Sequence, residues 1–269
     1  MHTYYGIDSG TREFYRLALS TLLDAGVPFI VGGGYALRYY THIEREMKDL
    51  DLFVRRADFP RVQSALERIG MRTELTFPHW LGKASCDAGF IDVIFSSGNG
   101  IAAVDDEWLR HARTARILGI EVLLSPPEEM IWSKAFIMER ERFDGADILH
   151  LLLAEAERLE WDRILRRFGI HWRVLLAHLT IFGFVYPCDR ARIPARVMHA
   201  LTARLQHETE QALAAEGPQE RVCQGTLLSR AQYLVDIDDW RYADARLKPP
   251  VSMSEQQVQR WTAAIDESG

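Results

Sequence analysis

Residues 31–52 read VGGGYALRYYTHIEREMKDLDL, and this stretch is the most informative part of the sequence. It begins with a glycine turn and ends with two alternating aspartates, Asp49 and Asp51. Successive side chains of an extended strand point to opposite faces, so both carboxylates are expected on one face while the leucines beside them pack into the core. Two carboxylates on one face can hold a hard cation such as magnesium, which prefers oxygen ligands.

The glycine turn supplies a complementary feature. A glycine turn that opens a helix brings bare backbone N–H groups and the positive end of the helix dipole close to an anion, which is the role expected of Gly33 and Gly34. A hydrophobic strand (28–31) precedes the turn and a helix-like run (35–42) follows it. Each half of the pattern is common, and a lone acid pair is more often solvated than catalytic. Their order along the chain predicts a phosphate site beside a metal site.

These residues resemble the nucleotidyltransferase superfamily that includes DNA polymerase β. Its signature is a hydrophobic residue, a Gly-Gly or Gly-Ser pair and, after a short interval, Asp-x-Asp between hydrophobic residues. Residues 33–37 and 45–52 are similar to this signature, with Met47 where the superfamily often has threonine. The interval from the glycines to the aspartates is slightly longer than is common.

The superfamily also has a third carboxylate on a neighbouring strand, and Phe90-Ile91-Asp92-Val93-Ile94-Phe95 supplies one. On physical grounds alone, a carboxylate within an apolar run is costly to bury unless it is paired or bound to a metal. Asp92 is therefore expected to join the two other aspartates. The alternative is a strand residue on a solvated edge face.

A further motif begins at Ser125. Ser125 and Glu128 have the spacing of a capping box, and the prolines between them suit the start of a helix. Lys134 would lie about two turns into that helix, where a lysine can extend its ammonium to water. The resemblance implies instead that Lys134 contacts a triphosphate.

The resemblance extends to residues 142–147, which are similar to an Arg-x-x-Asp-x-x-Asp segment. Asp144 would equally suit the cap of a helix beginning at Gly145. The implied substrate is a nucleoside triphosphate such as ATP, and the implied cofactor is magnesium or manganese. The implied site residues are Asp49, Asp51 and Asp92 as catalytic metal ligands, and Gly33, Gly34, Lys48, Lys134 and Asp147 as triphosphate contacts.

The pattern of elements predicts an α+β protein. A small mixed β-sheet nucleotidyltransferase core with helices is expected over residues 1–124, and a mainly α-helical C-terminal domain with a packed tail over residues 125–269. The chain has 269 residues, of which 48% are hydrophobic and 26% charged, enough to bury one large core or two smaller ones. The expected strands are 28–32, 49–54, 89–95 and 116–124. The expected helices are 11–25, 59–69, a short one around Trp108, 127–140, 146–159, 161–168, 171–184 and 194–214.

Location follows from the same patterns. Histidines and an arginine interrupt the apolar run 170–185, so no stretch is expected to span a bilayer, and the N-terminus shows no basic-then-apolar signal. A cytoplasmic protein with no membrane partner is the expectation.

Cysteine and histidine spacing bears on metal sites. Cys86, Cys188 and Cys223 are an odd number at wide spacing, which argues against a disulfide framework or a cysteine zinc site. No histidine pair has the H-E-x-x-H spacing, and His171 and His178 are expected as satisfied histidines on a helix surface. No zinc is predicted.

The acceptor is the open question. A net charge of −6 gives no support to a general nucleic-acid scaffold. Two arginine clusters are expected as solvated helix faces, although beside the acidic site they would make RNA a credible acceptor. The resemblance leaves RNA or tRNA, a small molecule such as an antibiotic, and a protein as acceptors. The alternative is a catalytically silent nucleotide-binding regulator or partner-binding module on the same fold. The clusters are Arg163, Arg166, Arg167 and Arg173, and Arg190, Arg192 and Arg196.

Overall fold

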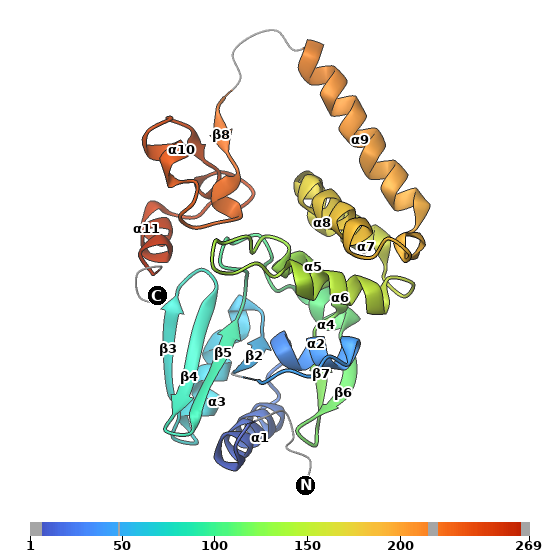
Figure 1. Ribbon diagram of the computed structural model, residues 1–269. Helices are drawn as coiled ribbons and strands as arrows, with labels where there is room; N and C mark the ends of the chain where they lie inside the picture. Colours follow the sequence, from blue (N-terminus) through green and yellow to red (C-terminus); the bar gives the residue numbers. More distant parts are fainter. Residues whose placement is uncertain (1–6, 48, 215–219, 265–269) are drawn as a thin grey trace. The chain divides into compact units, whose positions relative to one another are not determined.

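The structure is a computed structural model that describes residues 7–47, 49–214 and 220–264 (Figure 1). By its internal contacts the chain falls into two compact units, one of Met1–Pro126 with Pro250–Gly269 and one of Pro127–Pro249. The last described helix, α11 (Glu255–Ala263), thus belongs to the first unit. The domain boundary expected at residue 124 stays a prediction.

The first unit is built on a mixed sheet of seven described strands in the order β3-β4-β5-β2-β1-β7-β6. Strand β2 runs parallel to β5 and β1 parallel to β7, whereas the other neighbours are antiparallel. The predicted α+β class with a mixed sheet is confirmed. The strands are β1 (Ile30–Val31), β2 (Leu50–Phe53), β3 (Arg72–Phe77), β4 (Leu81–Cys86), β5 (Gly89–Ile94), β6 (Arg113–Ile117) and β7 (Ile120–Leu124).

Successive side chains of β2 alternate between the buried core and the opposite face of the sheet. Leu50 and Leu52 are fully buried, while Asp51 and Phe53 alternate with them and are partly exposed. The ring of Phe53 stacks on buried Trp108 at a centroid distance of 5.1 Å, so α4 (Asp106–His111) covers the sheet beside Asp51. The helices of this unit are α1 (Ser9–Asp24), α2 (Gly33–Thr41), η2 (Arg56–Asp58), α3 (Phe59–Glu67), α4 (Asp106–His111) and α11.

Two strand predictions need correction. The expected single strand 116–124 is a hairpin, because Leu118 and Gly119 both have positive φ, 50° and 84°, as a two-residue turn between β6 and β7 requires. No element was expected over residues 72–86, where the structure has β3 and β4. Phe77-Pro78-His79-Trp80 and Asp87-Ala88-Gly89 contain the turn residues that mark the ends of β4.

The second unit is mainly helical, as predicted. Helix α5 begins at Pro127 without the expected capping box, since Ser125 Oγ has no hydrogen-bond partner within the described chain. It ends at Lys134, well before the expected residue 140, and Met138 pairs instead with Phe143 in an isolated bridge. The elements are α5 (Pro127–Lys134), α6 (Gly145–Glu155), α7 (Trp161–Phe168), η3 (Gly169–His171), α8 (Trp172–Val185), η4 (Arg190–Arg192), α9 (Ala195–Ala214), β8 (Val222–Cys223), η5 (Gly225–Leu227), α10 (Leu234–Asp238), β9 (Ala243–Asp244) and η6 (Ala245–Leu247).

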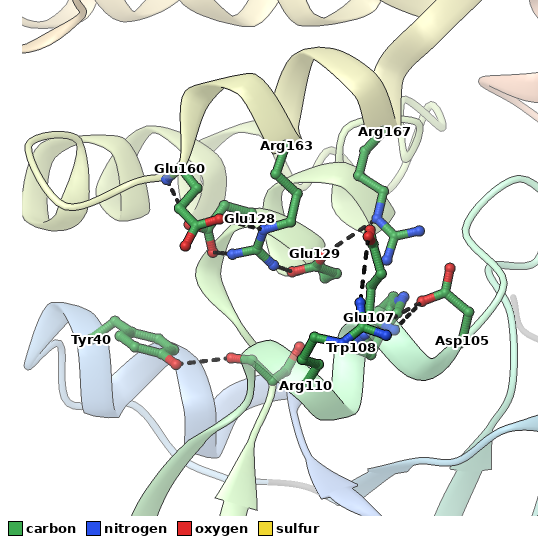
Figure 2. A network of polar contacts seen from close by, with 11 residues as sticks. Tyr40, Asp105, Glu107, Trp108, Arg110, Glu128, Glu129, Glu160, Arg163 and Arg167 are labelled. Atoms are coloured by element: carbon green, nitrogen blue, oxygen red, sulfur yellow. Dashed lines mark hydrogen bonds and ion pairs between the residues drawn. The ribbon is translucent and has the colours of Figure 1, made fainter.

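A buried ionic cluster holds α5 against α7 (Figure 2). The guanidinium of Arg163 lies 2.9 Å from Glu128 Oε2 and 2.7 Å from Glu129 Oε2, and all three side chains are at most 3% exposed. Arg167 Nε donates to Glu129 Oε1 at 3.2 Å, and Glu128 Oε1 accepts from the Glu160 N–H. The expectation that the first arginine cluster is a solvated face is therefore wrong for Arg163 and Arg167.

In the second arginine cluster Arg192 and Arg196 pair with acids, whereas Arg190 Nε donates to the carbonyl oxygen of Gly183. Arg192 lies 2.9 Å from Asp189 and 3.3 Å from Glu157, and Arg196 lies 2.5 Å from Asp162. Carboxylates of the same unit thus neutralise both arginines.

The two helical histidines are buried rather than on a surface. His178 Nε2 lies 2.9 Å from the carbonyl oxygen of Ala135, and His171 packs edge-on against the ring of Phe136. Burial lowers the pKa of both imidazoles below the ordinary value. The expectation of surface histidines is corrected, because this face of the helix packs into the core of the unit.

One stretch, Trp161–Val185, has the length and mean hydropathy, 1.4, of a membrane-spanning helix. Judged by length and composition alone, the expectation that no stretch is long enough to span a bilayer is therefore wrong. The structure breaks this stretch at Gly169, where α7 gives way to η3 and then α8. A buried core helix passes the same test, so the stretch is weak evidence for a membrane span.

Candidate active site

Three aspartates converge on one side of the sheet in the first unit. Asp49 directly precedes β2, Asp51 lies within β2, and Asp92 lies opposite Asp51 on the parallel neighbour β5. Each offers a carboxylate oxygen, and these atoms all lie within 4.8 Å of one another. The structure therefore brings together all three acids that the sequence singled out.

The electrostatics of the cluster reflect crowded, partly buried negative charge. Burial raises the pKa of the Asp92 carboxyl, the charge of Asp49 acts in the same direction, and Lys83 opposes them. Burial also raises the pKa of the Tyr15 phenol on α1 to about 12, and the charges of the three aspartates add to this rise. The surroundings of the cluster thus favour a positive charge.

The cluster fits a divalent cation. Asp92 Oδ1 is buried, and Lys83 Nζ lies 3.5 Å from it. Carboxylates crowded as closely as these three repel one another, and a cation among them relieves that repulsion. Three carboxylates are the oxygen ligands that hard cations such as magnesium and manganese take. The donor set therefore suits the metal that the sequence predicts.

The glycine turn lies directly against the acids. Gly33 opens α2 with φ +51°, and a Cβ added there would lie 1.7 Å from Asp51 Oδ2. The preceding residue ties the turn to β2, because the N–H of Gly32 donates to the carbonyl oxygen of Asp51 at 3.0 Å. A Cβ at Gly34 would meet Met47 Sδ at 2.7 Å. The start of α2 thus lies next to the carboxylates. A site for an anion and a site for a cation are therefore adjacent.

Gly33→Ala is expected to lower activity by more than the backbone strain at this position explains, because the added Cβ would also clash with Asp51. Gly26 has a similar φ, +60°, with nothing within 4 Å of an added Cβ, so Gly26→Ala introduces the strain without the clash. We expect Gly26→Ala to lower the free energy of unfolding by about 1–2 kcal/mol with activity retained. Gly33→Ala should displace Asp51 and lower nucleotidyl transfer about a hundredfold. Equal activities of the two variants, measured by pyrophosphate release, would contradict a close approach of Gly33 to the working site.

Two of the expected phosphate contacts lie in the second unit. Lys134 Nζ lies 2.6 Å from Asp144 Oδ2 and 2.8 Å from Asp147 Oδ2. Asp144 occupies the N-cap position of α6 but makes no capping hydrogen bond with its side chain, so the capping alternative is wrong. The carboxylate of Asp144 instead accepts from Lys134 and Arg142. Lys48, the remaining expected contact, lies outside the described residues.

The sequence patterns do not indicate Lys83 as a residue of the site. Its ammonium lies 3.5 Å from Asp92 Oδ1, directly across the β4–β5 pairing. The turn residues on both sides of β4 were the available signal for this strand. Lys83 could not be anticipated as a partner of Asp92, because the strand that carries it, β4, was not expected.

The mixed sheet with its acid cluster and glycine turn defines a protein of the nucleotidyltransferase class. A family model described as uncharacterised nucleotidyltransferase matches residues 16–180, more than half of the chain. The chain belongs to this family and is a nucleotidyltransferase. A search of curated proteins gives no match.

Several solved structures are similar to the chain over part of its length. The antibiotic-resistance factor ANT(2'')-Ia is 18% identical with a TM-score of 0.45, over 64% of this chain and 98% of that one. The lincomycin-bound lincosamide antibiotic adenylyltransferase LnuA is 17% identical with a TM-score of 0.38, over 54% and 97%. JHP933 from Helicobacter pylori is 14% identical with a TM-score of 0.37, over 77% and 98%. The family assignment rests on the family match.

Proposed function

We propose that this nucleotidyltransferase moves a nucleoside monophosphate from a nucleoside triphosphate to an acceptor hydroxyl or phosphate, with a divalent metal held by Asp49, Asp51 and Asp92. The observation that carries the proposal is the approach of three carboxylate oxygens within 4.8 Å of one another beside the turn at Gly33. When bound, magnesium or manganese supplies charge neutralisation on the triphosphate and the attacking oxygen.

The chain's own groups have separate tasks in this reaction. The backbone N–H groups at Gly33 and Gly34 face the phosphates at the start of α2. Asp49 and Asp51 hold the metal, and Asp92 completes the metal site or accepts the proton of the acceptor hydroxyl. Lys48, Lys134 and Asp147 remain proposed triphosphate contacts.

The bonds made and broken define the transfer. A bond forms between the acceptor oxygen and the α-phosphorus, and the bond from that phosphorus to the bridging oxygen breaks. Pyrophosphate leaves with the electron pair, and the proton of the acceptor passes to a carboxylate or to solvent. No side chain acts as a nucleophile in this scheme.

The acceptor is best identified by labelling. The purified chain is incubated with each α-labelled nucleoside triphosphate, magnesium and a cell extract, and the labelled product is assigned to RNA, protein or small molecules. A chain inactivated at Asp51 serves as the control. Label that appears equally with the control would refute the proposed transfer.

A catalytically silent regulator on the same fold predicts a different binding pattern. Thermal shift with each triphosphate, with and without magnesium, separates the two functions. Stabilisation that requires both triphosphate and metal supports the enzyme, whereas binding independent of metal supports the regulator. All three acids of the cluster are present, which favours the enzyme over the regulator. The proposed location is the cytoplasm.

A further inference from the structure

The order of the strands places the glycine turn and Lys83 at opposite ends of one row of side chains. Asp51 of β2 lies opposite Asp92 of β5, and Asp92 lies opposite Lys83 of β4. Gly33, which follows β1 on the other side of β2, approaches Asp51 from the opposite direction. Residues directly opposite one another on neighbouring strands point to the same face of a sheet, and the strands are about 4.8 Å apart. The row therefore runs from the turn, over the acids, to Lys83.

This order separates the two reactants of the proposed transfer. In an in-line displacement the attacking and leaving oxygens lie on opposite sides of the phosphorus. With the leaving pyrophosphate at the glycine turn, the acceptor comes from the side of β5 and β4. Beyond Asp92, Lys83 is then the next side chain of the row that faces the acceptor.

The ammonium of Lys83 suits an anionic group of the acceptor. Its Nζ lies 3.5 Å from Asp92 Oδ1 and 4.6 Å from the ring centroid of Phe90. An ammonium has three N–H donors, and the Lys83 side chain is 35% exposed, so it can also donate to a ligand. The carboxylate of Asp92 alone would repel an anionic acceptor. The ammonium beside it attracts such an acceptor and repels a cationic one.

The neighbouring row supplies a ring, a hydroxyl and a second cation. Phe90 lies opposite Ser85 of β4, which in turn lies opposite Arg72 of β3. Phe90 and Ser85 are two positions from Asp92 and Lys83, so this row faces the same side as the acids. Phe90 is 36% exposed and the Arg72 side chain 79% exposed. Ring and cations are thus open to a ligand beside the acid cluster.

Two further acids of this surface are engaged locally. Glu74, opposite Lys83 on β3, accepts from Thr76 Oγ1 at 2.9 Å. Asp87 lies 3.9 Å from Arg72, and both side chains are exposed. A pair in water contributes little, so a phosphate can compete with Asp87 for Arg72.

We propose that Lys83, Phe90 and Arg72 form the acceptor surface of the site, and that the acceptor is a ribonucleotide unit. Its hydroxyl faces Asp92, its phosphate contacts Lys83, and its base packs on Phe90, as bases do on aromatic side chains. A free nucleotide and the 3′ end of an RNA share this chemistry. Arg72, one row further from Asp92, adds a contact for the phosphate of a preceding nucleotide. The inference rests on the proposed function in placing the triphosphate at the glycine turn.

The test measures binding to the full chain at a fixed Mg²⁺ concentration. A short fluorescein-labelled single-stranded RNA with a free 3′ hydroxyl is the probe, and its fluorescence anisotropy is followed over a range of KCl concentrations. Lys83→Met should weaken binding about tenfold and reduce the slope of log K against log salt by about 0.7, the value for one phosphate contact on a single strand. Phe90→Leu should also weaken binding about tenfold but leave the slope unchanged, because stacking involves no phosphate.

Arg68→Met is the matched control. Arg68 is exposed and directly follows α3, whose Phe59 ring packs against Gly82 on the opposite face of the sheet from Lys83. We expect its affinity and salt slope to equal those of the wild type. Lys83→Arg keeps the charge and should retain the slope. Circular dichroism checks that each variant is folded, and Lys83→Gln replaces Lys83→Met if the latter does not fold.

The two sources of a ribonucleotide unit are separated with adenosine monophosphate as a competitor of the labelled RNA. For an RNA end, Arg72→Met weakens RNA binding and leaves the inhibition constant of the monophosphate unchanged. RNA that binds no more tightly than the monophosphate, and equally well to the Arg72 variant, would identify a free nucleotide as the acceptor.

The outcomes also separate this inference from the proposed function. RNA and monophosphate binding unchanged in the folded Lys83 variant, or absent from the wild type, would overturn the acceptor surface and leave nucleotidyl transfer intact. Transfer of label to a protein or to a cationic small molecule would do the same. The expected losses of binding in a chain that labels no molecule of a cell extract would support a ribonucleotide site at Lys83 and refute the proposed transfer.

Discussion

Asp51→Asn is expected to reduce magnesium-dependent pyrophosphate release by at least about a thousandfold, since a catalytic metal contributes several kcal/mol and each 1.4 kcal/mol is about tenfold in rate. Asp51 lies beside Asp92 on the neighbouring strand and against the backbone of Gly33. The substitution keeps the shape of the side chain and removes one ligand charge. It therefore tests the metal site rather than the packing of β2.

Stability provides the check on this result. Asp51→Asn keeps the size and shape of the side chain, so the variant should stay folded, and circular dichroism checks that it does. Asp24→Asn, at the exposed C-terminal end of α1, is the matched control and should retain full activity. Full activity of Asp51→Asn would exclude the cluster as the reaction site, as would an equal loss in the Asp24 variant.

Arg163→Ala is expected to lower the free energy of unfolding of the second unit by about 3–5 kcal/mol. Arg163 is 3% exposed and contacts Glu128 and Glu129, which are 3% and 0% exposed. Its removal leaves two buried carboxylates with one charge partner fewer, and their desolvation is no longer compensated. Denaturant unfolding followed by circular dichroism measures the loss.

An exposed arginine of the same unit serves as the control, because its loss shows how much of the change in the free energy of unfolding is due to burial. Arg196 is 58% exposed and lies 2.5 Å from Asp162, which is 72% exposed. Pairs in water contribute little, so Arg196→Ala should cost less than about 1 kcal/mol. Similar losses in the two variants would mean that the buried cluster contributes no more than a surface pair.

The effect of Arg163→Ala should also depend on pH. Burial already raises the pKa of Glu129, and the nearby arginines oppose this rise. Without Arg163 that pKa rises further, so the folded state binds a proton more readily than the unfolded state. The difference from the wild type should therefore shrink as pH falls from 8 towards 5.5. A loss that grows on acidification would contradict this origin of the instability.

Local sequence predicts the part of the site that lies on contiguous segments. The period-2 alternation of Asp49 and Asp51 with leucines, and the glycines before a helical run, are rules of neighbouring residues. Asp92 could be anticipated because an acid in an apolar strand needs a partner. The structure places all three acids together, while their catalytic roles stay a prediction.

These local rules do not predict contacts between segments that lie far apart in the sequence. The arginines of residues 163–167 have the composition of a solvated helix face, yet Arg163 is buried because Glu128 and Glu129 of another helix neutralise it. Ser125 and Glu128 have the spacing of a capping box, but Glu128 pairs with Arg163 and the Glu160 N–H instead. In both cases a tertiary ion pair outweighs a local preference, because a charge leaves water only where a partner is supplied.

The α+β class, the glycine turn and the three acids could be predicted from local sequence, because hydrophobic period and glycine placement act between near neighbours in the chain. Which charges meet depends on long-range packing. The register of β4 against β5 seats Lys83 on Asp92, and the packing of α5 against α7 buries Arg163. A pairing of strands or helices far apart in sequence sets such contacts, and no local pattern encodes their register.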